Sequence, residues 1–171
     1  MEHPMKQTIT HILCATDLSK HSAYTMCHAA SIAASTGAKL HLVHAVQPLS
    51  DETRTALQMY MQTTGSSETA EKARHDHAKA IMAERQRAFW DHVSEEDKGI
   101  RAQVASIELI DGYPAEVILR RASELNCDLI VLGAHEHGFS HTFLGTVAKR
   151  VLRRSNIPTL VVPYRGTAAH N

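Results

Sequence analysis

The stretch from Gly133 to Thr146 carries the residues best suited to chemistry. It reads GAHEHGFSHTFLGT, with glycines at 133, 138 and 145 and a threonine directly after the last of them. An apolar run precedes this stretch and an amphipathic pattern follows it, so Gly145 and Thr146 are expected at the start of a helix. Backbone amides and the positive end of the helix dipole meet there, and the stretch therefore predicts a phosphate site. Glycines that serve only unusual backbone angles are an equally good explanation.

Asp17 is the second residue of interest, because it follows the first apolar run of the chain, residues 9–15. A carboxylate at the end of a strand can contact a ligand, and it can equally well stabilise a turn or cap a helix. In a receiver domain it would help to hold magnesium while Asp111 accepted a phosphoryl group. Such a domain also needs a lysine after its last strand, where this chain has Pro163 and Tyr164. Receiver chemistry is therefore not expected, and the first two explanations of Asp17 stay open.

Thirteen histidines raise the question of a metal site. His135, His137 and His141 are close in sequence, but zinc needs three or four converging ligands. Neither an HExxH motif nor a closely spaced cysteine pair accompanies them, and no P-loop or GxGxxG motif occurs elsewhere. We expect no metal beyond the magnesium that accompanies a bound nucleotide.

Composition narrows the class of protein further. The chain has 171 residues, which is the size of one domain, and its 18 Lys and Arg balance 18 Asp and Glu. This balance argues against binding to nucleic acid or to a membrane surface, and no apolar run is long enough to span a bilayer. Cys14, Cys27 and Cys127 are widely spaced in apolar surroundings, which predicts buried, reduced thiols. With no apolar leader at the amino terminus, we expect a cytoplasmic protein.

The rest of the chain alternates short apolar runs with amphipathic stretches. Strands are expected over 9–15, 38–46, 101–110, 128–132 and 159–162, and helices between Ser19 and Gly37 and over 51–62, 68–93, 114–126 and 145–155. This alternation predicts an α/β fold with a mostly parallel sheet and helices on both faces. In such sheets ligands bind beyond the carboxyl ends of the strands, where the strand order reverses.

Five segments carry a resemblance to a known family. ILCATDLS, LHLVHAV, GYPAEVILRRA, DLIVLGAH and LGTVAKRVLRRSNIPTLVV are similar in order and spacing to the universal stress protein family. The resemblance implies one Rossmann-like domain over residues 9–164, between tails at 1–8 and 165–171, with a five-stranded parallel sheet of order 3-2-1-4-5. It also implies a homodimer. Many members bind ATP or AMP through a loop written G-x2-G-x9-G-(S/T), whereas others lack the loop and bind no ATP.

The resemblance assigns the site residue by residue. Asp17 would meet the ribose or adenine, the backbone of Ala45 would meet the adenine, and Gly133, Gly145 and Thr146 would hold phosphates. The other expected contacts are Ala15, Thr16, Leu132, His135 and Gly138.

The loop of this chain departs from the family pattern at two points. Glu136 stands where the second glycine is expected, and eight residues, not nine, separate it from Gly145. Gly138, two residues further on, would partly replace the missing glycine. The carboxylate of Glu136 would repel a nearby polyphosphate. The loop is therefore compatible both with nucleotide binding and with its loss.

The resulting expectation is a cytoplasmic stress-response regulator that binds an adenine nucleotide, ATP or AMP, and is not an enzyme. The alternatives are an interaction module without nucleotide and a weak ATPase or phosphotransfer protein, in which Asp17 and Thr146 would handle magnesium and ATP. The expected homodimer forms through the last strand, Thr159, Leu160, Val161 and Val162, because an apolar edge strand invites pairing. Protein clients are expected, but the sequence does not identify them.

Overall fold

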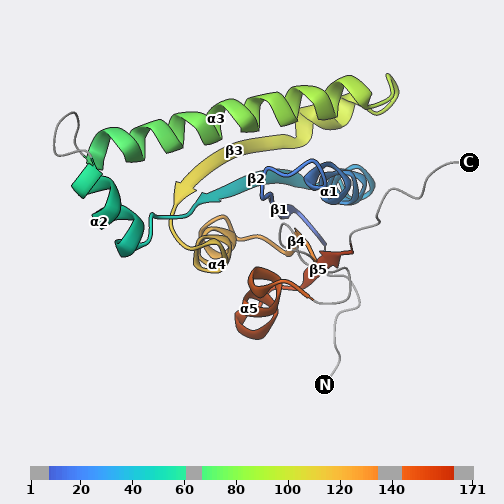
Figure 1. Cartoon of the computed structure of the whole chain (residues 1–171). Coiled ribbons are helices and arrows are strands. Elements are labelled where there is room, and N and C mark those ends of the chain that lie inside the picture. The colour runs from blue at the N-terminus through green and yellow to red at the C-terminus, as the bar shows by residue number, and fades with distance from the viewer. Residues whose placement is uncertain (1–7, 61–66, 135–143, 164–171) are drawn as a thin grey trace, which may run out of the picture.

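The fold is a single five-stranded sheet covered by helices (Figure 1). The computed structural model describes residues 8–60, 67–134 and 144–163. The strands are β1 (His11–Ala15), β2 (Lys39–Val46), β3 (Val104–Asp111), β4 (Leu129–Gly133) and β5 (Thr159–Val162). They lie in the order β3-β2-β1-β4-β5, and every neighbouring pair is parallel. Both the α/β class and the expected strand order are confirmed.

Helices connect the strands as crossovers. They are α1 (Ser22–Thr36), α2 (Asp51–Tyr60), α3 (Ser67–His92), α4 (Pro114–Glu124) and α5 (Thr146–Arg154), with a 3-10 helix, η1 (Lys98–Gln103), before β3. α1 and α3 cover one face of the sheet, and α4 and α5 cover the other (Figure 1). Among the described residues, no helix has both the length and the apolar character needed to cross a membrane.

Alternation along the strands supplies a core on each face of the sheet. In β1, Ile12 and Cys14 pack beneath α1 and α3, whereas Leu13 packs beneath α4 and α5. Successive strand side chains point to opposite faces, so a strand at the centre of the sheet must be apolar throughout. β4 follows the same rule, since four of its five residues are buried.

The start of α1 differs from the expectation. The sequence predicts a helix that starts at Ser19, but α1 begins at Ser22 after His21, and the side chain of His21 makes no capping hydrogen bond. The loop before it is stabilised by its own hydrogen bonds: the amide of Leu18 donates to Thr16 Oγ1, and the amide of Ser19 donates to Asp17 Oδ1. Leu18 also adopts a φ of 63°, which is incompatible with a helix. The chain therefore turns before it can form a helix.

Two further expectations need correction. Residues 101–103 belong to η1 and not to the third strand, because Gln103 Nε2 donates to the carbonyls of Ala33 and Ala38 and ties the segment to the end of α1. Cys27 is exposed, so the prediction of three buried thiols was wrong for this residue.

The remaining two cysteines are buried as predicted. Burial raises the pKa of Cys14 to about 12, and burial with the nearby Asp128 raises that of Cys127 to about 11. Both thiols therefore stay protonated at neutral pH.

Candidate functional site

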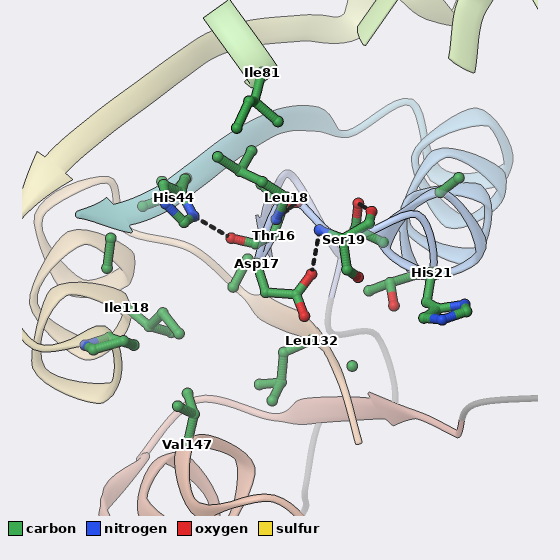
Figure 2. Close-up of a pocket in the computed structure, with 18 of the residues that line it drawn as sticks. Thr16, Asp17, Leu18, Ser19, His21, His44, Ile81, Ile118, Leu132 and Val147 are labelled. Carbon is green, nitrogen blue, oxygen red and sulfur yellow. Dashed lines mark hydrogen bonds between the residues drawn. The ribbon is translucent and has the colours of Figure 1, made fainter. Parts of the chain in front are cut away.

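A cavity of about 1500 Å³ opens at the carboxyl ends of β1, β2 and β4 (Figure 2). The chain passes from β1 outward to β2 and β3, and then crosses back to place β4 and β5 on the other side of β1. The order reverses beside β1, and this is where ligands bind in open α/β sheets. We call this space the switch-point cavity.

The loop after β1 forms one side of the switch-point cavity. The amide of Thr16 donates to the carbonyl of Val43 at 2.9 Å, and the carbonyl of Thr16 accepts from His44 Nδ1 at 2.8 Å. Both contacts tie the loop to β2. The carboxylate of Asp17 accepts a hydrogen bond from the amide of Ser19 at 2.9 Å, and Asp17 is exposed to solvent. The loop is thus held from both sides with Asp17 on the cavity wall.

α3 holds the same loop from above. Arg85 Nε donates to the carbonyl of Leu18 at 3.1 Å, and Leu18 packs against Ala78 and Met82 of α3. This hydrogen bond explains why the charged Arg85 lies on the inner face of a long helix. The bond satisfies the carbonyl of Leu18, which lies in the loop and has no partner in a neighbouring strand.

Apolar side chains make much of the remaining wall. Figure 2 shows Ile118 of α4, Leu132 of β4 and Val147 of α5 converging on the space below β2. A wall of this kind suits a flat, weakly polar ring, since ligand pockets are mostly apolar with a few placed polar groups.

Charged and polar groups gather on two sides of the cavity. Lys20 and His21 lie just before α1, and Arg74 and His77 lie on α3. The Arg74 guanidinium donates to the carbonyl of Gln47, which joins α3 to the end of β2. Lys20 and Arg74 outnumber the single acidic residue of the described lining, Asp17, so the cavity favours an anionic ligand.

Most of the expected site residues that the structure describes meet in this cavity. Those that line it are Ala15, Thr16, Asp17, Ala45, Leu132 and Gly133. His135 and Gly138, together with Glu136, lie outside the described residues.

Gly145 and Thr146 do not line the cavity. Gly145 precedes the first residue of α5 as expected, but its amide donates to the carbonyl of Ala134 at 2.7 Å. An amide used in this bond is not available to a phosphate. Gly133 does line the cavity, and its φ is not positive, so an unusual backbone angle does not account for this glycine.

Sequence reasoning missed Thr25, Lys20 and His21, as well as Arg74 and His77 of α3. Thr25 had a usable signal, because it stands at helical spacing with Ala29 and Ala33 and is a polar residue in an apolar stripe. No signal in the sequence marks Arg74 and His77, since only the packing of α3 over the loop after β1 brings them to the cavity.

The acidic residues of the described chain do not form a metal site. Asp111 at the end of β3 pairs with His75 of α3 at 3.6 Å and does not line the cavity that Asp17 lines. Within the described ranges, no three His, Cys, Asp or Glu side chains gather closely enough to hold a metal ion.

Comparison with known proteins gives the family. The profile described as the universal stress protein family matches residues 8–163. A universal stress protein of Methanocaldococcus jannaschii is 23% identical over 157 residues, which cover 91% of this chain and 96% of the relative. The universal stress protein A homolog 1 of Coxiella burnetii is 29% identical over 158 residues, which cover 89% of this chain and 94% of the relative.

Solved structures show the same fold. The universal stress protein UspA of Lactobacillus plantarum has a TM-score of 0.66 at 22% identity, with 92% of this chain and 99% of that chain covered. A universal stress protein solved in complex with cAMP has a TM-score of 0.55 at 24% identity, with 91% and 98% covered. Because the family profile runs from before β1 to the end of β5, the chain belongs to the universal stress protein family.

Proposed function

We propose that this protein binds an adenine nucleotide in the switch-point cavity and acts as a nucleotide-responsive regulator. The observation that carries the proposal is the meeting of Asp17, Ala45 and Gly133, from the ends of three strands, around one cavity. Strand ends at a switch point bind ligands throughout this class of sheet. The relative solved with cAMP also supports an adenine nucleotide as the ligand.

The residues that line the cavity support a position for each part of a nucleotide. The adenine lies against the apolar wall that includes Ile118 and Leu132, with the backbone of Ala45 beside it. A carboxylate accepts several hydrogen bonds, so Asp17 can accept a ribose hydroxyl as well as the amide of Ser19. The positive residues at the cavity wall favour the phosphate.

The proposal is that the nucleotide is held and not turned over. The carboxylate of Asp17 accepts a hydrogen bond from the Ser19 amide and so stabilises the loop, which is a structural role and not a catalytic one. In the alternative of a weak ATPase, this carboxylate would instead handle magnesium and ATP.

Nucleotide release is the first test. The purified protein is denatured, the precipitate is removed, and the supernatant is separated by anion-exchange chromatography. We expect AMP, ADP or ATP in an amount comparable to that of the protein. Protein that releases no nucleotide, and that shows no heat of binding with AMP or ATP at millimolar concentration, would establish the interaction module without nucleotide.

Hydrolysis is measured separately on the same preparation. Asp17→Asn keeps an acceptor for the Ser19 amide and removes the negative charge, so it is a matched control. We expect wild type and Asp17→Asn to show the same background release of phosphate from ATP with magnesium. Turnover that only the wild type shows would support the ATPase.

A further inference from the structure

We propose that the phosphate of the bound nucleotide lies between the start of α1 and the end of β4, held by Thr25, Lys20 and His21 beside Gly133. This inference rests on the proposed function and specifies it, because it places the anionic end of the ligand. It differs from the expectation, drawn from the family resemblance, that Gly145 and Thr146 hold the phosphates.

Thr25 is the central observation. It is 6% exposed and lines the cavity, and within the described chain its hydroxyl has no hydrogen-bond partner. The hydroxyl is not among the fully buried atoms that lack a partner, so it remains open to the water of the cavity, and a ligand group can replace that water. The hydroxyl faces the end of β4: a Cβ built on Gly133 would lie 3.4 Å from Thr25 Oγ1. A donor is thus placed in the cavity wall without a partner in the protein.

The residues just before α1 add positive charge at the same place. Lys20 and His21 both line the cavity and directly precede the helix, and the first turn of α1 has no acidic residue. His21 lies one helical turn before Thr25, on the same side of α1. Figure 2 shows His21 on the α1 side of the cavity. A lysine, a histidine and a hydroxyl donor at one end of the cavity suit a phosphate ester.

The position fits the proposed ribose contact. Asp17 lies three residues before Lys20 in the same loop, so a nucleotide whose ribose meets Asp17 can direct its 5′ substituent toward the start of α1. The Asp17 carboxylate repels a phosphate, and the charge of Lys20 offsets that repulsion. A nucleoside 5′-phosphate is therefore the expected ligand class.

The start of α5 is less suited to this role. The amide of Gly145 is used by the carbonyl of Ala134, whose own amide donates to the carbonyl of Val162 at 2.8 Å. These bonds tie Gly145 through Ala134 to β5. Neither Gly145 nor Thr146 reaches the cavity wall.

The test compares AMP with adenosine by isothermal titration calorimetry, because the two ligands differ only in the phosphate. Wild type is expected to bind AMP more tightly than adenosine. Thr25→Val replaces the hydroxyl with a methyl group of similar size, and we expect about a tenfold loss of AMP affinity with adenosine affinity unchanged. Thr25→Ser keeps the hydroxyl and is expected to bind AMP as wild type does.

Lys20→Ala tests the charge and has a matched control on α3. Lys20 and Lys79 are both exposed, but only Lys20 lines the cavity. We expect Lys20→Ala to weaken AMP binding several-fold and to reduce its dependence on salt, and Lys79→Ala to change neither. Thermal unfolding of each variant verifies that it is folded.

Three results would overturn the inference. Equal affinities of wild type for AMP and adenosine would remove the phosphate subsite and leave the nucleoside part of the proposed function intact. Unchanged AMP binding in Thr25→Val and Lys20→Ala, with a loss in Thr146→Ala, would place the phosphate at α5. Wild type that binds neither ligand would overturn the proposed function together with this inference.

Discussion

At the scale of single residues, His41 is a polar residue buried in the sheet, toward the amino ends of the strands. It is 5% exposed, and its Nδ1 contacts Ser106 Oγ at 2.8 Å while its Nε2 contacts His11 Nδ1 at 3.1 Å. The two imidazole rings also stack, with centroids 5.4 Å apart. This chain of bonds joins β1, β2 and β3 beneath the same helices that cover Leu13.

The environment of His41 favours the neutral imidazole. Burial lowers its pKa most, the neighbouring His11, Arg121 and Lys39 lower it further, and the Glu108 carboxylate raises it in part. If both imidazoles became imidazolium ions, the N–H of His11 Nδ1 would face the N–H of His41 Nε2, so the two rings cannot both be fully protonated. The folded protein therefore resists protonation of His41.

We predict that stability falls as the pH drops below about 6.5. The unfolded chain binds a proton at the ordinary histidine pKa of about 6.5, whereas folded His41, with its lowered pKa, does not. Below that pH the unfolded state holds more protons, so acid favours unfolding. Urea unfolding at pH 7.5, 6.5 and 5.5 should show a smaller decrease in the free energy of unfolding for His41→Gln than for wild type.

The control for this prediction is an exposed histidine. His28→Gln on α1 should keep the wild-type dependence on pH. A His41→Gln variant whose pH dependence equals that of wild type would mean that other groups carry the acid sensitivity.

At the scale of elements, β5 is one of the two edge strands of the sheet, the other being β3. It is the last strand in the sheet order, and three of its four residues are only partly buried. The carbonyl of Pro158 accepts the amide of Ile130 in β4, and the carbonyl of Val162 accepts that of Ala134 just after β4, so residues 158, 160 and 162 face the sheet. In a strand the backbone groups of alternate residues point to opposite sides. Thr159 and Val161 therefore present theirs to the open edge, and we propose that a second copy of the chain pairs there.

The prediction is that Val161→Pro produces a monomer. Proline removes the Val161 amide at the open edge and leaves the bonds to β4 in place. Val161 also packs against the core beneath α4 and α5, so Val161→Ala is the control that loses the same side-chain contacts but keeps the amide. Light scattering at micromolar concentration should give a dimer mass for wild type and Val161→Ala and a monomer mass for Val161→Pro. A monomeric wild type would contradict the dimer.

At the scale of the whole molecule, the sheet separates two polar regions. The switch-point cavity occupies the carboxyl ends of the strands, and the His41 cluster lies toward the amino ends, with the two apolar cores between helices and sheet. A ligand in the cavity contacts residues from the ends of β1, β2 and β4 and from α1, so its binding energy adds to the stability of the folded chain.

We predict that AMP raises the melting temperature by roughly 5–10 °C. Ligand at a hundred times its dissociation constant stabilises the folded state by about 2.7 kcal/mol. In proteins of this size each kcal/mol corresponds to roughly 2–4 °C. Differential scanning calorimetry with AMP, and with sodium chloride at equal ionic strength as control, measures the shift. A melting temperature that AMP leaves unchanged would argue against binding to the folded chain.

Local patterns in the sequence were sufficient for most of the elements. The run at 159–162 is β5 without change, Pro114 begins α4, and Gly37 ends α1 with a φ of 73°. Each of these features depends on neighbours in the chain: apolar alternation, the fixed φ of proline and the freedom of glycine at positive φ. The strand order came from resemblance to the family, because periodicity shows that a strand is buried but not which strand lies beside it.

Tertiary structure alone decided which of the expected residues form the site and which residues join them. The sequence indicated strand ends and a glycine loop, but it did not show that the Gly145 amide is used by Ala134 or that Thr25 faces Gly133. Both facts depend on contacts between residues more than ten positions apart, which the packing of α1 and α5 against the sheet creates. Helical periodicity in the sequence predicts which face of α1 is buried. It does not predict that this face lies opposite the end of β4, where the Thr25 hydroxyl becomes part of the cavity wall.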